Sequence, residues 1–108
     1  MNLEEVIVNA LGKVKATNII AFDTKEKSPF YDEMIVASVS SLRQATAVTT
    51  YLKEDVEASG FNVRAIEGKE TGWVIVDCYD ILVSIFTEEE REHFKIEKIY
   101  LDVPQKNL

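Results

Sequence analysis

The chain has 108 residues, of which 46% are hydrophobic and 29% charged, a composition typical of one globular domain over residues 1–108 and not of a disordered chain. Its net charge of −7 repels phosphate backbones, which argues against direct DNA binding and favours basic partners. The apolar runs are too short to span a membrane and the acidic start is unlike a signal peptide, so the sequence predicts a cytoplasmic protein.

The chain holds a single cysteine, Cys78, and a single histidine, His93. One cysteine excludes an intramolecular disulfide and a cysteine-built zinc site, and His93 has no second ligand type beside it. We therefore expect no metal and no cofactor, with His93 at the surface. Asp77 and Asp80 flank Cys78 and are expected to raise its pKa, which argues against a nucleophilic thiolate.

The first part of the chain predicts a helix and two strands. Apolar residues recur at helical spacing over residues 3–15, with Asn2 and Glu5 at the spacing of a capping box. Residues 18–23 predict a short strand. Residues 33–39 form a nearly continuous apolar run, which is typical of a strand buried on both faces.

A second helix is predicted from Ser41, which has capping-box spacing to Gln44, as far as Ser59 and Gly60. Alternating residues over 61–65 then predict a strand with one wet face. A strand, helix and strand of this length are expected to cross over right-handed and to pair in parallel.

Two apolar runs within residues 72–86 flank the polar break between Asp77 and Asp80, which predicts a central hairpin. Thr87 and Glu90 have capping-box spacing and begin a short acidic helix, and the residues from Pro104 onward are expected to fray. The fold class is α/β (α+β), a mixed five-stranded sheet flanked by three helices.

Charged residues suggest two kinds of chemistry. Asp77 and Asp80 are closely spaced carboxylates near a strand end, where such a pair can hold magnesium or act as acid and base; it can equally satisfy backbone donors of a turn. Arg43 at a helix start opposes the helix dipole, which favours a specific carboxylate partner, although a solvated arginine is the simpler interpretation.

Aromatic residues gather around the hairpin and the tail. An exposed set would mark a protein interface, whereas a buried set would be core. The sequence leaves both alternatives open for Tyr79 and Tyr100, and favours burial of Phe94.

Together these residues resemble the ribosomal silencing factors, the Iojap-like proteins, over essentially the whole chain. The resemblance rests on residues in a characteristic order, namely Asp32, Ser41, Arg43, Gln44, Glu67, Gly68, Trp73, Asp77, Asp80 and Phe86, followed by Arg91, Glu97 and Tyr100. The chain departs from the family pattern where Val39 and Tyr79 replace glycines, Ser84 a histidine and Tyr100 a tryptophan. The two lost glycines put the local backbone geometry in question.

The resemblance implies a translational repressor without catalytic activity, on a fold similar to that of nucleotidyltransferases. Such a protein binds the large ribosomal subunit through ribosomal protein L-fourteen, blocks joining of the small subunit, and has also been linked to large-subunit biogenesis. Many members form homodimers. The residues that we expect to bind the partner are Trp73, Asp77, Tyr79, Asp80, Glu97, Tyr100 and Arg43.

Two alternatives stay open. One is a divergent nucleotidyltransferase or nucleotide-binding protein that uses Asp77 and Asp80 on magnesium. The other is a protein-binding module with a different basic partner.

Overall fold

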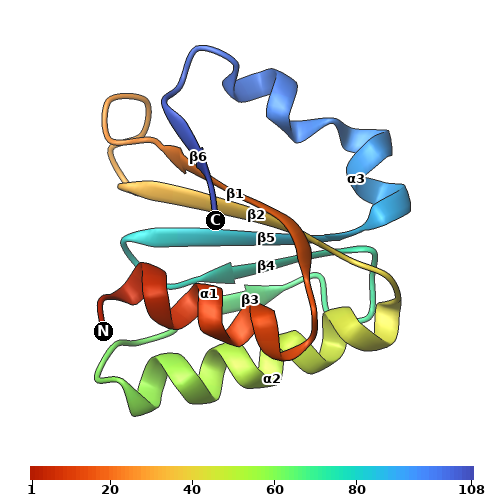
Figure 1. Cartoon of the computed structure of the whole chain (residues 1–108). Coiled ribbons are helices and arrows are strands. Elements are labelled where there is room, and N and C mark those ends of the chain that lie inside the picture. Colours follow the sequence, from red (N-terminus) through yellow and green to blue (C-terminus); the bar gives the residue numbers. More distant parts are fainter.

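The computed structural model describes residues 1–108, with the exception of the side chain of Glu97. Within this described part, three α-helices and six strands follow one another, with a short 3-10 helix near the end (Figure 1). Their order is α1 (Leu3–Lys13), β1 (Thr17–Asp23), β2 (Glu33–Val39), α2 (Leu42–Ala58), β3 (Ala65–Glu67), β4 (Trp73–Asp77), β5 (Ile81–Thr87), α3 (Glu88–Phe94), η1 (Ile96–Tyr100) and β6 (Gln105–Asn107).

The strands form one mixed sheet in the order β3-β4-β5-β2-β1-β6. The pair β2 and β5 is parallel and every other neighbouring pair is antiparallel. The mixed α/β class is confirmed. The count of five strands is wrong for the described residues, because β6 pairs with β1 through Lys106 opposite Ala21.

The sequence predicted that the C-terminal residues fray, and this prediction is wrong because they form β6. Pro104 lies just before β6, and its carbonyl accepts a hydrogen bond of 2.8 Å from the backbone N–H of Asp23. A three-residue strand with exposed side chains leaves almost no apolar pattern in a sequence, which explains the error.

The strand predicted over residues 61–65 begins later, as β3 at Ala65. Phe61 and Val63 pack against the core and alternate with exposed neighbours, which imitates the pattern of a strand. Their backbone, however, is not part of the sheet. The expected parallel pairing of β2 with this strand is also wrong. Short connections make β3, β4 and β5 consecutive antiparallel neighbours, so β4 and β5 lie between β3 and β2.

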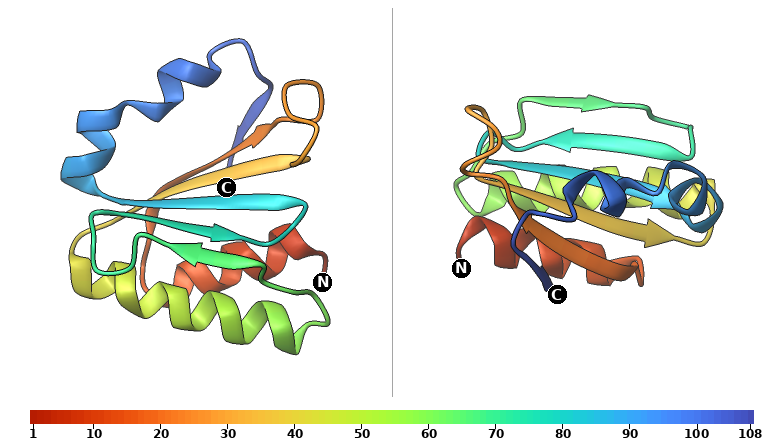
Figure 2. Two further views of the ribbon diagram at one scale, coloured as in Figure 1. Left: turned by 180° about the vertical axis from the view of Figure 1, so that it is seen from behind. Right: turned by 90° about the horizontal axis from the view of Figure 1, so that it is seen from above.

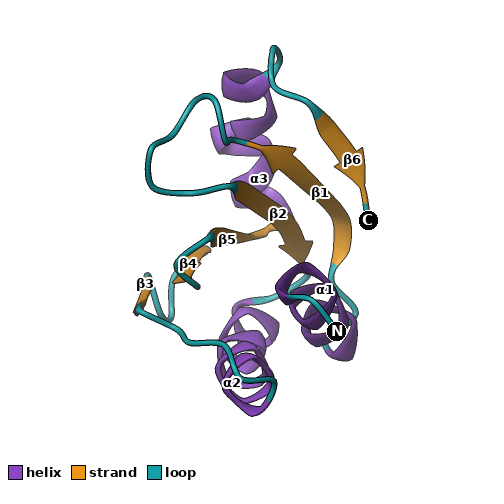
Figure 3. Cartoon of the chain, turned by 90° about the vertical axis from the view of Figure 1, so that its left-hand side faces the viewer, coloured by secondary structure: helices purple, strands orange, loops and turns teal.

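The two faces of the sheet are covered unequally. Helices α1 and α2 pack against each other and cover one face, whereas α3 and η1 lie over the other, as the side view shows (Figures 2 and 3). The α1–α2 side holds the larger apolar cluster, with Ile7, Leu52 and Ile85 fully buried. The other side holds a smaller cluster around Phe22 and Phe86.

The predicted helix starts are confirmed. The Asn2 side chain accepts from the Glu5 amide at 2.8 Å, and the Thr87 hydroxyl accepts from the Glu90 amide at 3.3 Å. Ser41 caps α2 in the same way, since its hydroxyl accepts from the Gln44 amide at 3.2 Å. The Gln44 side-chain oxygen accepts from the Ser40 amide, one residue before the cap, and its nitrogen donates to the carbonyl of Val14 at 3.1 Å. This contact joins the start of α2 to the end of α1.

Replacing Leu52 by Ala should lower the free energy of unfolding by about 2–5 kcal/mol, because Leu52 is fully buried between α2 and the sheet. Urea unfolding followed by circular dichroism measures the change. The neighbouring exposed Lys53→Ala is the control and should stay within about 0.5 kcal/mol of the parent chain. Equal effects of the two changes would contradict the assigned helix face.

Candidate docking site

The face of β4 that points away from α1 and α2 is only partly covered. Burial alternates along β4, so Val74 and Val76 are fully buried while Trp73, Ile75 and Asp77 are half-buried. Residues two apart in a strand share a face, which places these three side chains on the α3 side of the sheet. Leu82, opposite Asp77 on β5, is also half-buried. These side chains form a continuous, partly open surface, named here the β4 face.

Aromatic rings line one end of the β4 face. The Trp73 ring stacks on Phe86 with centroids 5.0 Å apart and lies 4.8 Å from the ring of Phe94. The expectation that Phe94 is buried is wrong, since 42% of it is exposed. Phe94 is the last residue of the short helix α3 at the rim of the sheet, so it covers Trp73 on one side and meets solvent on the other.

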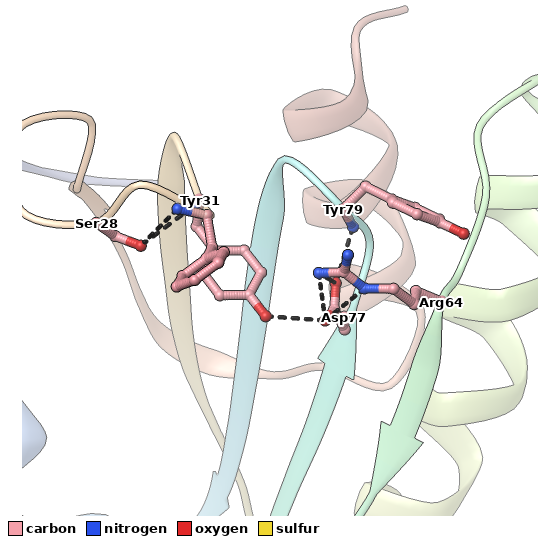
Figure 4. A network of polar contacts seen from close by, with 6 residues as sticks. Ser28, Tyr31, Arg64, Asp77 and Tyr79 are labelled. Carbon is pink, nitrogen blue, oxygen red and sulfur yellow. Dashed lines mark hydrogen bonds and ion pairs between the residues drawn. The ribbon is translucent and has the colours of Figure 1, made fainter.

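The carboxylate of Asp77 organises the other end of the β4 face (Figure 4). It accepts hydrogen bonds from the Tyr31 hydroxyl at 2.8 Å and from the Tyr79 amide at 2.9 Å. Arg64 donates to both carboxylate oxygens, with its shortest contact from Nη2 at 2.9 Å. One side chain thus joins the β1–β2 loop, the segment before β3 and the β4–β5 turn.

These contacts keep Asp77 ionised. Partial burial opposes its charge, but the bonds from the Tyr79 amide, the Tyr31 hydroxyl and the Arg64 guanidinium together lower the pKa of Asp77 below its ordinary value. The interpretation of Asp77 as a residue that satisfies turn donors is confirmed by the Tyr79 amide bond. Because four donor atoms, with Arg64 Nε as the fourth at 3.1 Å, already use its lone pairs, Asp77 has little capacity left for a partner.

Tyr79 projects from the turn beside this network. It is 47% exposed, and the Arg64 guanidinium carbon lies 4.8 Å from the centroid of its ring. Its φ of 70° is in the left-handed region, which a glycine adopts without strain and a tyrosine adopts at a cost. The concern about a missing glycine therefore applies here. It does not apply at Val39, which lies within the extended, buried strand β2.

The other predicted site residues lie in different places. Tyr100 is half-buried with its ring 5.4 Å from Phe22, on the same side of the sheet as Trp73. Arg43 is exposed in the first turn of α2, the helix that covers the opposite face, and none of the described residues forms an ion pair with it. The side chain of Glu97 lies outside the described part of the structure.

Asp80 lines a separate cleft of about 650 Å³, together with Asp32, Glu33 and Lys106. Asp77 is absent from the lining of that cleft, so the paired use of both aspartates on magnesium gains no support from the geometry. Among the described residues, no group of three or more potential ligands is arranged to hold a metal ion. Burial, aided by Asp77, raises the pKa of the Cys78 thiol to about 12. The direction agrees with the sequence expectation, but burial is the main cause and Asp80 is not one of the causes.

Sequence reasoning missed Arg64 and Tyr31. The predicted strand over residues 61–65 placed Arg64 on its solvent-exposed face, where an arginine needs no partner. Nothing in the residue spacing connects Tyr31 with Asp77, which lies 46 residues away. Only the arrangement of the strands brings these side chains together.

Glu33 gives the fold a pH dependence. Burial and a hydrogen bond to the Glu4 carboxylate raise the pKa of Glu33 from 4.5 to about 8, so the folded chain keeps a proton that the unfolded chain releases between these values. The contribution of Glu33 to stability is therefore full below about pH 4.5 and declines as the pH rises towards 8.

We expect Glu33→Gln to match the parent chain at acidic pH and to be more stable by about 1 kcal/mol at alkaline pH, the size being limited by solvent screening of a half-exposed group. Urea unfolding across this pH range tests the expectation. Glu54→Gln, at an exposed position of α2, is the control for a lost carboxylate. A parallel pH dependence of parent and Glu33→Gln would refute the role of Glu33.

Comparison with known proteins identifies relatives along the whole chain. A family model described as "Ribosomal silencing factor during starvation" matches residues 1–108. A ribosomal silencing factor of Haemophilus influenzae is 34% identical over 101 residues, covering 93% of this chain and 99% of the relative. One of Halalkalibacterium halodurans is 30% identical over 107 residues, covering 98% of this chain and 92% of that protein.

Solved structures show the same arrangement. Protein CV0518 from Chromobacterium violaceum superposes with a TM-score of 0.85 at 29% identity, over 93% of this chain and 87% of that one. A structure from Bacillus halodurans gives the same TM-score and identity over 98% of this chain and 97% of its own. The mixed sheet with its helices is therefore the shared fold. Among the described residues, no helix combines the length and apolarity needed to cross a bilayer.

Proposed function

Because the chain belongs to the ribosomal silencing factor family, we propose that it represses translation by binding the large ribosomal subunit and preventing the small subunit from joining. The family is regulatory and ribosome-associated, which is the basis of the proposal. We also propose that the chain contacts ribosomal protein L-fourteen, acts in the cytoplasm and has a further role in large-subunit biogenesis. The similarity of its fold to that of nucleotidyltransferases is likewise part of the proposal.

The observation that carries the proposal is the half-covered β4 face, which ends in the exposed Tyr79. Partly open apolar side chains beside an exposed aromatic are characteristic of protein interfaces. Trp73, Ile75 and Leu82 supply apolar surface there, and Tyr79 supplies an aromatic ring held by Arg64. We assign the docking surface to this face, with Tyr100 beside it.

Charge supports a basic protein as the occupant. The first turn of α3 carries Glu88, Glu89 and Glu90, and α3 starts next to Trp73, since the Thr87 amide donates to the Gly72 carbonyl at 2.9 Å. With a net charge of −7, the chain is attracted to basic ribosomal proteins. In the proposed complex Asp77 holds Tyr79 and Arg64 in place. A direct contact of Arg43 with the partner stays a prediction.

Steric exclusion requires only affinity and bulk. The folded chain measures 33 × 32 × 22 Å, which is enough to keep two subunit surfaces apart when it is bound between them. This mechanism involves no bond making, in keeping with an Asp77 whose lone pairs are taken by donors within the chain.

Self-association is a separate part of the proposal. The edge strands β3 and β6 have three residues each, and short edges offer few backbone groups for pairing with a second copy. We therefore expect any homodimer to use the β4 face and to compete with the ribosome.

Replacing Tyr79 by Gly separates docking from stability. Glycine relieves the left-handed backbone while the contact with Arg64 is lost, so the free energy of unfolding should stay within about 1 kcal/mol of the parent chain. Loss of an exposed hot-spot aromatic should weaken binding by about 2 kcal/mol, roughly thirtyfold.

Sedimentation with purified large subunits over a range of protein concentrations measures the affinity. Tyr51→Ala removes an exposed aromatic from α2, away from the β4 face, and is the matched control with unchanged binding expected. Undiminished binding by Tyr79→Gly would remove Tyr79 from the interface even if the parent chain binds.

A further inference from the structure

The indole nitrogen of Trp73 is buried without a hydrogen-bond partner among the described residues. Trp73 is the single tryptophan of the chain, and its ring lies against both Phe86 and Phe94. An indole N–H can only donate, and a buried donor without an acceptor is unfavourable because water no longer solvates it. Most buried tryptophans avoid this situation by bonding to a neighbour.

The position of Phe94 suggests how the donor becomes accessible. Upstream of Phe94, α3 is fixed by Arg91, which donates to the Ser38 hydroxyl at 3.0 Å and to the Asn18 carbonyl. Phe94 ends the helix and is followed by Lys95, whose φ of 48° reverses the chain into η1. A partly exposed ring at a helix end beyond the anchoring residue can change position without disturbing the sheet.

We propose that the Trp73 indole N–H is the hydrogen-bond donor that the β4 face offers to a carbonyl oxygen of its partner protein, and that displacement of the Phe94 ring uncovers it. The inference rests on the proposed function and names the chemistry of its docking site. A protein carbonyl fits better than an RNA phosphate, because the rings of Phe86 and Phe94 make the surroundings of the Trp73 N–H apolar and the chain is acidic.

Replacing Trp73 by benzothienylalanine tests the donor directly, since this residue keeps the two-ring shape and substitutes sulfur for the N–H. We expect the dissociation constant for large subunits to rise about tenfold, equivalent to about 1.4 kcal/mol. We expect the melting temperature of the free protein to stay equal or to rise, because an unsatisfied buried donor is removed. A merely structural role of the ring would leave the affinity unchanged.

The outcomes separate the two claims. If the parent chain does not bind large subunits, the proposed function fails and this inference fails with it. If the parent and the benzothienylalanine chain bind equally, only the inference fails. The tenfold loss should also appear with isolated ribosomal protein L-fourteen, and a loss confined to intact subunits would assign the acceptor to RNA and overturn the protein carbonyl.

The role of Phe94 in covering the Trp73 indole N–H is tested in the free protein. The one indole N–H resonance should exchange slowly with water in the parent chain and at least tenfold faster in Phe94→Ala. Ile99→Ala, an exposed apolar position on η1, is the control and should leave the exchange rate unchanged. Equal exchange in the parent and Phe94→Ala would overturn the role of Phe94 as the cover.

Discussion

The β4 face depends on one constraint, which is that the Asp77 carboxylate must stay ionised and bonded to its donors. Those donors come from Tyr31, Arg64 and the Tyr79 amide, which belong to segments far apart in the sequence. Charge-assisted bonds of this kind are stronger than neutral ones and are specific in direction. Asp77 thereby fixes the turn in which Tyr79 takes up an unfavourable backbone conformation and presents its ring.

Unequal covering of the sheet explains why this face is available at all. Helices α1 and α2 cover one side and enclose the larger apolar cluster, so the fold gains its main apolar core without needing the other side of β4. Over that other side, α3 packs on β5 and β2, and the Tyr100 ring of η1 lies against Phe22 of β1, but Ile75 and Leu82 stay half-buried. The larger part of the apolar core and the partly open surface proposed for docking thus lie on opposite faces of the sheet.

The sequence predicted those features that local patterns encode. The capping pairs of Asn2 and Thr87 marked helix starts, and the polar break before Ile81 marked the hairpin. It could not predict β6, whose exposed residues carry no apolar pattern, nor that two strands separate β3 from β2. For the site, it singled out Trp73, Asp77 and Tyr79 but not Arg64 or Tyr31, because side-chain partners distant in the sequence leave no mark on spacing.

Subunit joining is the most direct test of the central claim that this acidic domain separates ribosomal subunits by occupying one of them. Purified large and small subunits are mixed at a magnesium concentration that supports joining, and light scattering reports the joined particle as the protein is added. The account predicts that scattering falls as protein is added, with the protein then sedimenting with large subunits. Unchanged joining at concentrations that saturate the large subunit would contradict it.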